Sequence, residues 1–305
     1  MEGQRIVNER PAELKLNNLE LLSRVGEGGM STVWKARDLT TGEIVAVKLL
    51  SHESAANRED IVAFWEEELL LEKCRHQGIV RAYRLHQEGG LWYFVMEYVE
   101  GYNFGDLLRR KQHVSEADCL LICESVAVAL DYAWNEHGIV HCDIKPENIM
   151  INSDGIVKLT DLGISHRFRN SAPAAIAVSD HVLGTPAYIS PEQVFGDVEL
   201  DCRADIYSLA ATLYHLSTGR VLFPDLSTEN AMRAHCSPCQ QAADPRTYRP
   251  LISEGFCQLL EAMLVKDRDE RVSNWSAVFQ MCQEIESGVK FKPRASTSPS
   301  SIVLL

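Results

Sequence analysis

The sequence predicts an α+β fold with two parts, a small one built on a five-stranded antiparallel sheet with one helix, and a larger, mainly helical one. Up to about residue 100, short β-branched and aromatic segments alternate with turn residues, which is typical of antiparallel strands. Beyond Gly101, apolar residues recur at helical spacing. These two patterns place the boundary between the parts near residues 101 and 102.

The composition describes an ordinary globular chain. It has 305 residues, of which 46% are hydrophobic and 24% are charged, and this length supports one large domain or two lobes with a core. The formal net charge of −13 argues against a broad basic surface for nucleic acid and is read as a solubility feature. No apolar run approaches the ~18 residues that a membrane span requires. We therefore expect neither nucleic acid nor a membrane span.

The cysteines point to a reducing compartment. All nine are scattered, and no signal peptide precedes them, so we expect free thiols and a cytoplasmic location. Cys236 and Cys239 have the spacing of a zinc-binding pair. No second pair of Cys or His lies nearby, so two incidental thiols in a loop are favoured over a zinc site.

The first part begins after a polar leader over residues 1–18, which we expect to be flexible. A helix is expected over residues 57–74, where Phe64, Glu67 and Leu71 share one face. Glu67 would then point inward with an apolar stripe, although a plain charged surface is the alternative because more glutamates lie close by. The five expected strands are Leu19–Val25, Val33–Arg37, Glu43–Leu50, Ile79–Gln87 and Leu91–Tyr98.

The second part is expected to run from residue 102 to 287 and to be followed by a Ser/Pro-rich, disordered tail over residues 288–305. Ser115, with Asp118 three residues later, has the pattern of a helix N-cap. Gly219 stands where the residue after a helix C-terminus belongs. The expected helices are Phe104–Lys111, Ser115–His137, Asp205–Ser217 and Glu254–Val265.

One hairpin in the second part suggests a chemistry. Ile149–Ile151 and Ile156–Thr160 read as strands joined by a turn ending in Asp154-Gly155. Because the start of one strand lies next to the end of its partner, Asn148 and Asp161 should sit side by side. Two oxygen donors beside Asp143 and Lys145 suit a hard cation that carries a phosphate. The hairpin therefore predicts phosphoryl transfer.

A glycine-rich loop between the first two strands has several interpretations. In a dinucleotide-binding fold such glycines open a helix, but here β-branched and aromatic residues follow them. A phosphate loop ending in Gly-Lys-Ser/Thr is excluded, because no lysine follows the glycines. A strand–loop–strand arrangement fits best, and a simple hairpin turn remains the structural alternative. The stretch is Gly26-Glu27-Gly28-Gly29-Met30-Ser31-Thr32-Val33.

Taken together, the motifs resemble those of a protein family. The glycine loop, Val45-Ala-Val-Lys48, His141-x-Asp143-x-Lys145-x-x-Asn148, Asp161-Leu-Gly163 and Ser190-Pro-Glu192 follow one another in the order of the protein-kinase signatures. Over residues 19 to 287 the chain resembles a eukaryotic-like serine/threonine protein kinase, and its glycine loop is most similar to bacterial members. The resemblance implies a bilobal protein-kinase-like fold with an N-lobe over 19–101 and a C-lobe over 102–287.

The resemblance also implies ATP as the phosphoryl donor. The glycine loop, including the flanking Val25 and Val33, would cover its phosphates. Glycine allows that approach because it has no Cβ. Val33, Ala46 and Met150 would form the apolar walls around adenine, with Met96 at the entrance. The main chain of Glu97 and Val99 would hydrogen-bond the base.

The catalytic roles are implied in the same way. Lys48, paired with Glu67, would hold the α and β phosphates, and Asn148 and Asp161 would bind Mg²⁺, with Mn²⁺ as a possible substitute. Asp143 would act as the base, Lys145 would stabilise the transferring phosphoryl group, and Thr185 would contact both. A lysine at position 145 favours serine and threonine over tyrosine as acceptors.

Two further pairings implied by the family are structural. Glu192 would pair with Arg271, and Asp205 would brace the backbone of the catalytic loop. The segment around Arg271 lacks the prolines that usually accompany it. Ser31 in place of a third glycine and Leu162 in place of the usual Phe are further departures, and both are tolerated in the family.

Cys142 is the departure with a regulatory meaning, since it replaces the arginine that normally precedes the catalytic Asp. That arginine binds a phosphorylated activation-loop residue, which a thiol cannot do. We therefore expect a kinase that depends little on activation-loop phosphorylation, or one controlled by a regulatory partner protein. The hydroxyls available in that loop are Ser165, Ser171 and Ser179.

Two other functions are weighed against an active kinase for protein serine or threonine. A pseudokinase that only binds ATP would have lost one of the catalytic residues, and all of them are present. A kinase-like enzyme for a small molecule is disfavoured by the intact Gly184–Glu192 segment, which resembles the peptide-positioning part of protein kinases. The short tail suggests either a soluble kinase or one truncated before a membrane anchor or sensor domain.

Overall fold

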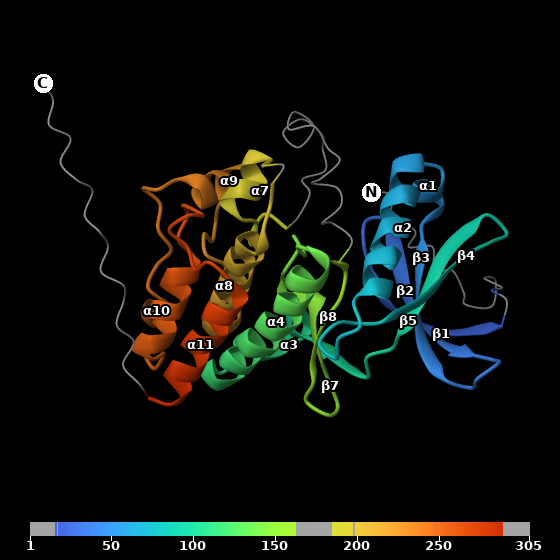
Figure 1. The fold of residues 1–305 in the computed structure, drawn as a ribbon, viewed down its shortest axis with the longest axis horizontal. Helices are drawn as coiled ribbons and strands as arrows, with labels where there is room; N and C mark the ends of the chain where they lie inside the picture. Colours follow the sequence, from blue (N-terminus) through green and yellow to red (C-terminus); the bar gives the residue numbers. More distant parts are fainter. Residues whose placement is uncertain (1–15, 17, 163–184, 198, 289–305) are drawn as a thin grey trace, which may run out of the picture.

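The computed structural model describes residues 16, 18–162, 185–197 and 199–288. The expected five-stranded antiparallel sheet is present, with strand order β1-β2-β3-β5-β4 (Figure 1). Leu16 differs from the expected leader, because it is buried and packs with Leu21 and Trp34. The strands are β1 Leu19–Glu27, β2 Ser31–Asp38, β3 Ile44–Leu50, β4 Ala82–Glu88 and β5 Leu91–Glu97.

Two helices pack beside this sheet, where the sequence predicts one (Figure 1). Helix α2 (Arg58–Lys73) is the expected one, and Asn57 caps its N-terminus by accepting from the Glu59 amide. Helix α1 (His52–Ala55) was not predicted, because four residues are too short for a helical period to show. It begins at the Ser51 cap, whose hydroxyl accepts from the Ser54 amide.

A second sheet of three strands lies between the first sheet and the helical part (Figure 1). The predicted hairpin forms β7 (Ile149–Asn152) and β8 (Val157–Leu159), and β6 (Gly101–Asn103) pairs with β7. A Cβ on Gly101 would lie 1.9 Å from the carbonyl oxygen of Ile151, so only glycine fits there. Strand β6 spans the boundary expected at residues 101 and 102, and the ranges of the two lobes remain predictions.

The remaining described chain is helical and is centred on α8 (Figure 1). Fifteen of the 17 residues of α8 are buried, which makes it the axis of this core. Helices α3, α4, α8 and α10 were predicted, whereas α7, α9 and α11 were missed. The bounds are α3 Phe104–Lys111, α4 Glu116–His137, α7 Pro191–Phe195, α8 Cys202–Thr218, α9 Thr228–Cys236, α10 Glu254–Met263 and α11 Trp275–Glu286, with short 3₁₀ turns η2 Pro146–Asn148 and η4 Pro245–Thr247.

The expected helix ends are observed at two positions. Ser115 accepts a hydrogen bond from the Asp118 amide at 3.1 Å, and Gly219 ends α8 at a φ of 75°. All nine cysteines are free thiols. Within the described ranges, no helix has the length and apolarity that crossing a membrane would need. The activation-loop serines 165, 171 and 179 lie outside the described residues.

Candidate active site

Lys48 and Glu67 meet between the first sheet and α2. Lys48 lies on the buried strand β3, and Glu67 points inward from α2 as its spacing predicts. Lys48 Nζ is 2.5 Å from Glu67 Oε1 and 2.5 Å from Asp161 Oδ1, which follows β8. The ammonium group also lies 5.9 Å from the ring centroid of Phe94. A cation on the first sheet is thus tied to a carboxylate at the end of the hairpin.

Burial and neighbouring charges shift the pKa values of Lys48, Asp161 and Glu67. Burial opposes a charged lysine, but the carboxylates of Asp161 and Glu67 raise the pKa of Lys48 above its ordinary value. Although burial opposes ionisation, the neighbouring Lys48 lowers the pKa of Asp161 to about 2. Burial raises the pKa of Glu67 to about 7, against the attraction of Lys48. Lys48 and Asp161 therefore remain charged at neutral pH.

Asp143 lies at the centre of a second cluster. Its Oδ2 accepts hydrogen bonds from Lys145 Nζ at 2.7 Å and from Asn148 Nδ2 at 3.0 Å. Its Oδ1 accepts from the Thr185 hydroxyl at 3.3 Å, and Lys145 Nζ reaches the same hydroxyl at 3.1 Å. Asp143 is 7% exposed. Asp143, Lys145 and Asn148 belong to one loop, and the fold brings Thr185 to them from a separate stretch of sequence.

The loop that carries Asp143 is held in an uncommon backbone conformation. Cys142 has a φ of 65° and Asp161 a φ of 60°, a region that residues with side chains rarely occupy. The Asp205 carboxylate accepts hydrogen bonds from the amides of His141 at 2.6 Å and Cys142 at 2.8 Å. Burial raises the pKa of Asp205 to about 6. As expected, Asp205 braces this loop from the first turn of α8.

The hairpin brings the ends of its strands together as predicted. The Thr160 amide donates to the Asn148 carbonyl oxygen at 3.0 Å, so Asn148 lies beside the residue that precedes Asp161. His141 Nε2 lies 2.9 Å from the Thr160 carbonyl oxygen and joins the catalytic loop to the same strand end. The Asn148 side chain donates through Nδ2 to Asp143, which leaves its Oδ1 as the remaining acceptor.

The glycine loop connects β1 and β2, so the strand–loop–strand interpretation is correct. Gly28, Gly29 and Glu27 are exposed, and the Gly28 amide donates to the Ser31 carbonyl oxygen at 2.8 Å. A Cβ on Gly29 would have no other described residue within 4 Å. Val25 is exposed, while Met30, Ser31, Thr32 and Val33 are partly buried. The fold itself therefore does not require glycine at position 29.

The residues expected around adenine lie on strands of both sheets. Ala46 on β3 is opposite Met96 on β5, and Met150 lies on β7. The carboxylate of Glu97 is 2.9 Å from Lys158 Nζ, and its amide donates to the Arg81 carbonyl oxygen at 2.8 Å. The amide of Glu97 is therefore already engaged within the fold. Val99 is buried two residues further along.

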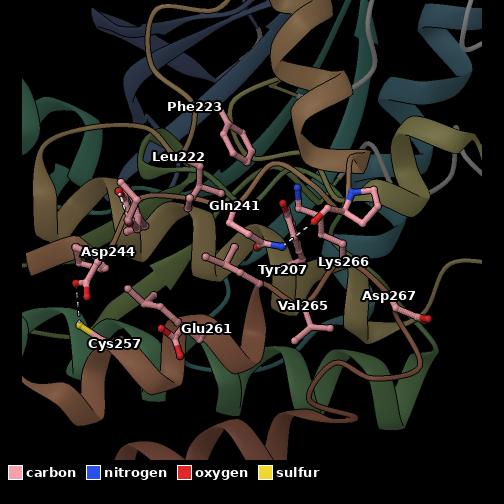
Figure 2. Close-up of a pocket in the computed structure, with 17 residues that line it drawn as sticks. Tyr207, Leu222, Phe223, Gln241, Asp244, Cys257, Glu261, Val265, Lys266 and Asp267 are labelled. Carbon is pink, nitrogen blue, oxygen red and sulfur yellow. Dashed lines mark hydrogen bonds between the residues drawn. The ribbon is translucent and has the colours of Figure 1, made fainter. Parts of the chain in front are cut away.

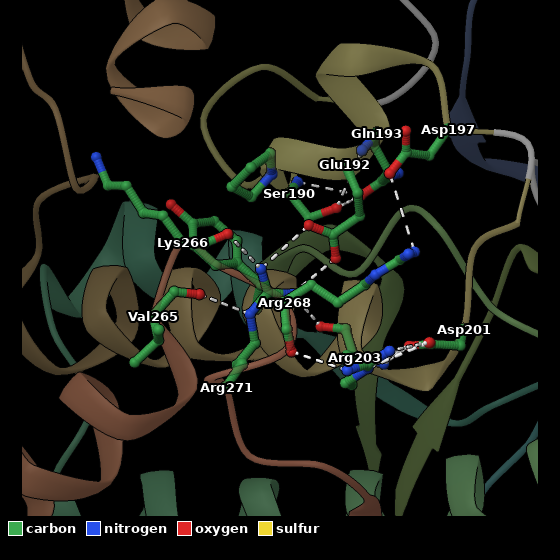
Figure 3. Close-up of polar contacts among 12 residues, drawn as sticks. Ser190, Glu192, Gln193, Asp197, Asp201, Arg203, Val265, Lys266, Arg268 and Arg271 are labelled. Atoms are coloured by element: carbon green, nitrogen blue, oxygen red, sulfur yellow. Dashed lines mark hydrogen bonds and ion pairs between the residues drawn. The ribbon is translucent and has the colours of Figure 1, made fainter. Parts of the chain in front are cut away.

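Glu192 and Arg271 form a buried ion pair (Figure 3). Arg271 donates to the two carboxylate oxygens at 2.7 and 3.1 Å, and its side chain is fully buried. It also donates to the carbonyl oxygens of Val265 at 2.7 Å and Arg203 at 2.5 Å. The missing prolines therefore do not prevent the pairing, because main-chain carbonyls of the neighbouring segment hold the guanidinium.

Gln193 is a site residue that the sequence reasoning missed. Its Nε2 donates to the Cys142 carbonyl oxygen at 2.8 Å, and its Oε1 accepts from the Ser190 amide at 3.1 Å. Ser190-Pro-Glu-Gln193 is a capping box at the start of α7, a pattern visible in the sequence. Through Gln193, α7 is connected directly to the residue before Asp143.

A cavity of about 500 Å³ lies elsewhere, between α8 and α10 (Figure 2). Tyr207, Phe223, Leu260 and Lys266 are among the residues that line it, and none of the predicted site residues does. The Lys266 ammonium is engaged by the carbonyl oxygens of Ala234, Ser237 and Gln240. We place the candidate active site at the charged clusters instead, because they hold groups suited to proton transfer and phosphate binding.

Comparison with known proteins agrees with this geometry. The family model described as protein kinase domain matches residues 19–284. A probable serine/threonine-protein kinase of Clostridium perfringens is 33% identical over 285 residues, which cover 93% of this chain and 40% of the relative. Serine/threonine-protein kinase PrkC of Bacillus subtilis is 30% identical over 273 residues, covering 89% of this chain and 40% of PrkC.

A further relative is matched over a larger share of its length. The PknA serine/threonine-protein kinase of Corynebacterium glutamicum is 32% identical over 279 residues, covering 90% of this chain and 57% of the relative. The chain thus spans about 40 to 57% of the length of these relatives. Since the family model covers most of the chain, and the residues around Asp143 and Lys48 have the expected arrangement, the chain belongs to the protein kinase domain family.

Proposed function

We propose that this protein is a serine/threonine protein kinase that transfers the γ-phosphoryl group of Mg-ATP to a hydroxyl of a protein substrate. The observation that carries the proposal is the cluster in which Lys145, Asn148 and Thr185 all contact the Asp143 carboxylate. Phosphoryl transfer depends mainly on positioning and charge stabilisation, and this cluster supplies both.

The two oxygens of Asp143 would have different tasks. Oδ2 is occupied by Lys145 and Asn148, whereas among the described residues Oδ1 has only the longer contact to Thr185. Oδ1 is therefore the atom best placed to accept the proton of the substrate hydroxyl. Lys145 Nζ, between Asp143 and Thr185, would stabilise charge on the phosphoryl group during transfer.

The residues present suit the nucleotide and its metal. Asp161 is an ionised carboxylate, and Asn148 has its amide oriented so that Oδ1 remains for a cation. Hard oxygen donors of this kind match Mg²⁺, which neutralises phosphate charge when it is bound, and they would also accept Mn²⁺. Lys48, held by Glu67, would bind the α and β phosphates. The glycine loop from Gly26 to Ser31 would cover the phosphates.

The adenine site would use the apolar residues already described. Val33, Ala46 and Met150 would enclose the base, with Met96 at the entrance. The Glu97 carbonyl and the Val99 main chain would hydrogen-bond its edge. The free thiols favour a reducing, cytoplasmic compartment.

A labelled-phosphate assay tests the function. Incubating the protein with γ-labelled ATP, Mg²⁺ and casein should label casein, and Asp143→Asn should lower that rate by about 10³-fold or more, since general-base catalysis is lost. Asp154→Asn, in the exposed hairpin turn, is the matched control and should keep full activity. Binding of ATP without any transfer would favour the pseudokinase alternative. Label on small metabolites alone would favour a small-molecule kinase.

Regulation forms a second part of the proposal. Cys142 is 3% exposed and packs with Val140 and Ala204, so its position offers no cation to a phosphate. We infer activity that depends little on phosphorylation of Ser165, Ser171 or Ser179, or control by a partner protein. Enzyme treated with a phosphatase, and a variant with all three serines changed to alanine, should retain at least half of the wild-type rate. Loss of activity that returns on phosphorylation of one serine would refute it.

A further inference from the structure

Helix α2 has an apolar outer surface in addition to its buried face. Val62 is 40% exposed, Trp65 53% and Leu69 37%. These positions are three and four residues apart, so the side chains form one stripe along the helix. Glu67 lies about 160° away around the helix, toward Lys48. An ordinary surface helix is apolar on one side only, so the second stripe calls for an explanation.

Charged residues lie at both ends of this stripe. Arg58 and Glu59 stand in the first turn of α2, and Glu72 and Lys73 stand at its end. All four are exposed, and the ion pairs formed within the described part of the chain use none of them. At about 100° per residue, Glu72 falls on the flank of the stripe nearer Trp65, and Glu59 falls on the opposite flank. Arg58 and Lys73 lie closer to the centre line of the stripe. Arg58 is displaced toward the Trp65 side, and Lys73 is displaced toward the Glu59 side.

This arrangement is complementary to itself. If a second α2 packs antiparallel across the stripe, a twofold axis perpendicular to both helices keeps each flank on its own side. Arg58 then faces Glu72 of the second copy, and Lys73 faces Glu59 of that copy. Val62 meets Leu69, and Trp65 lies near the axis beside its own counterpart. Each of these four charges meets its opposite, and each such contact occurs twice.

We propose that the outer face of α2 is an interface at which two copies of this chain associate, with their α2 helices antiparallel. A seam centred on one helix is small for a protein interface, so we expect a reversible dimer with a micromolar dissociation constant. The dimer would fix the position of α2, the helix that carries Glu67. The inference concerns association alone and does not depend on the proposed kinase activity.

Sedimentation equilibrium over a range of protein concentrations tests the interface. The wild-type protein should dimerise, and Trp65→Glu should leave it monomeric over the same range. Leu121→Glu is the matched control, because Leu121 is a 45% exposed apolar residue on α4, and this variant should dimerise like the wild type. Circular dichroism checks that both variants fold. A monomeric wild type, or an unchanged dimer in Trp65→Glu, would overturn the proposal.

Charge reversal tests the antiparallel register. Arg58→Glu and Glu72→Arg should each weaken the dimer by about tenfold, since each replaces two attractive contacts with two repulsive ones. The double variant restores both pairs in reversed order and should dimerise within about threefold of the wild type. Independent, additive losses in the double variant would rule out this register. Arg84→Glu, on the edge strand β4, controls for net charge and should have no effect.

A cross-link gives a second readout. In a background where the exposed Cys239 is changed to serine, Trp65→Cys should form an interchain disulfide with oxidised glutathione as the oxidant. Leu121→Cys should not do so under the same conditions. If only Leu121→Cys cross-links, or if neither does at concentrations where the wild type dimerises, the antiparallel α2 seam is wrong.

Discussion

Asn148 Nδ2 donates hydrogen bonds to both the carbonyl oxygen of Asp143, at 2.9 Å, and Oδ2 of the same residue, at 3.0 Å. The amide thus orients the carboxylate and at the same time turns its own oxygen away from it. This relationship joins the residue proposed as the base to a residue proposed to bind the metal. Any change at position 148 should therefore affect two parts of the site together.

Asn148→Asp should lower kcat by about 10²-fold or more, because a carboxylate cannot donate to Asp143 and would repel it. Asn152→Asp is a matched control on the same hairpin. The Asn152 side chain accepts from the amides of Asp154 and Ile156, and an aspartate can still accept both. Steady-state kinetics should therefore show a large loss for position 148 and less than about a twofold change for position 152.

The Asp205 carboxylate should make stability depend on pH in a specific window. Burial raises its pKa from an ordinary 3.8 to about 6. The folded state therefore holds a proton that the unfolded state has released, so this contribution is complete below about pH 4 and is lost as the pH rises through about 6.

Asp205→Asn removes that titration. The asparagine NH2 group cannot accept a hydrogen bond, so one of the two amides that donate to the Asp205 carboxylate loses its acceptor, which should cost about 1–3 kcal/mol. Urea unfolding of both proteins across pH 4 to 7 is the measurement. The stability gap between wild type and variant should narrow as the pH rises over this window. A gap that stays constant or widens would contradict the buried, protonated carboxylate.

Removing one partner of the buried Glu192–Arg271 pair should destabilise the folded protein strongly. Arg271→Met leaves a buried, unpaired carboxylate and should destabilise the fold by about 3–5 kcal/mol. Arg268→Met is the control, because the contacts of Arg268 lie at the surface, 3.9 Å from the exposed Asp197 and 2.9 Å from the Glu199 carbonyl oxygen, and losing them should cost less than about 1 kcal/mol. Equal losses of stability in the two variants, measured by urea unfolding, would argue against the structural role of Arg271.

The sequence predicts the parts of this fold that repeat or that follow local rules. The alternation of β1 to β5, the hairpin turn at Gly155 and the caps at Ser115 and Gly219 are local patterns, and the structure confirms them. Helix α1 and strand β6 were missed because four and three residues hold too little periodicity. Helices α7, α9 and α11 were also overlooked, although each begins at a Ser or Asn cap.

The site divides in the same way. The helical period of α2 predicted that Glu67 points inward, whereas its pairing with Lys48 was implied by the family resemblance, and the two residues do form an ion pair. The hydrogen bond from Gln193 to Cys142 joins residues 51 positions apart, and no local pattern connects them. The second apolar stripe of α2 is the reverse case, in which a local pattern exists but does not show where the side chains lie. Its spacing is visible in the sequence, but only the structure shows that Trp65 is exposed.

Two glycines of the loop should matter for nucleotide binding and not for the fold. A Cβ on Gly28 would lie 3.6 Å from the Ser31 carbonyl oxygen, which is an ordinary contact, and one on Gly29 would have no other described residue within 4 Å. Gly28→Ala and Gly29→Ala should therefore leave the urea midpoint unchanged. If phosphates approach this backbone closely, each variant should raise the KM for ATP by about threefold or more, since a methyl group would intervene.

Gly101→Ala serves as the opposite control for these glycines. Its Cβ would overlap the Ile151 carbonyl oxygen, so it should destabilise the protein by more than about 2 kcal/mol. Comparing the variants by unfolding and by ATP kinetics separates a glycine needed for packing from one needed for a ligand. An unchanged KM in both loop variants would remove the glycine loop from the proposed nucleotide site, because close backbone approach is the reason for placing the phosphates there.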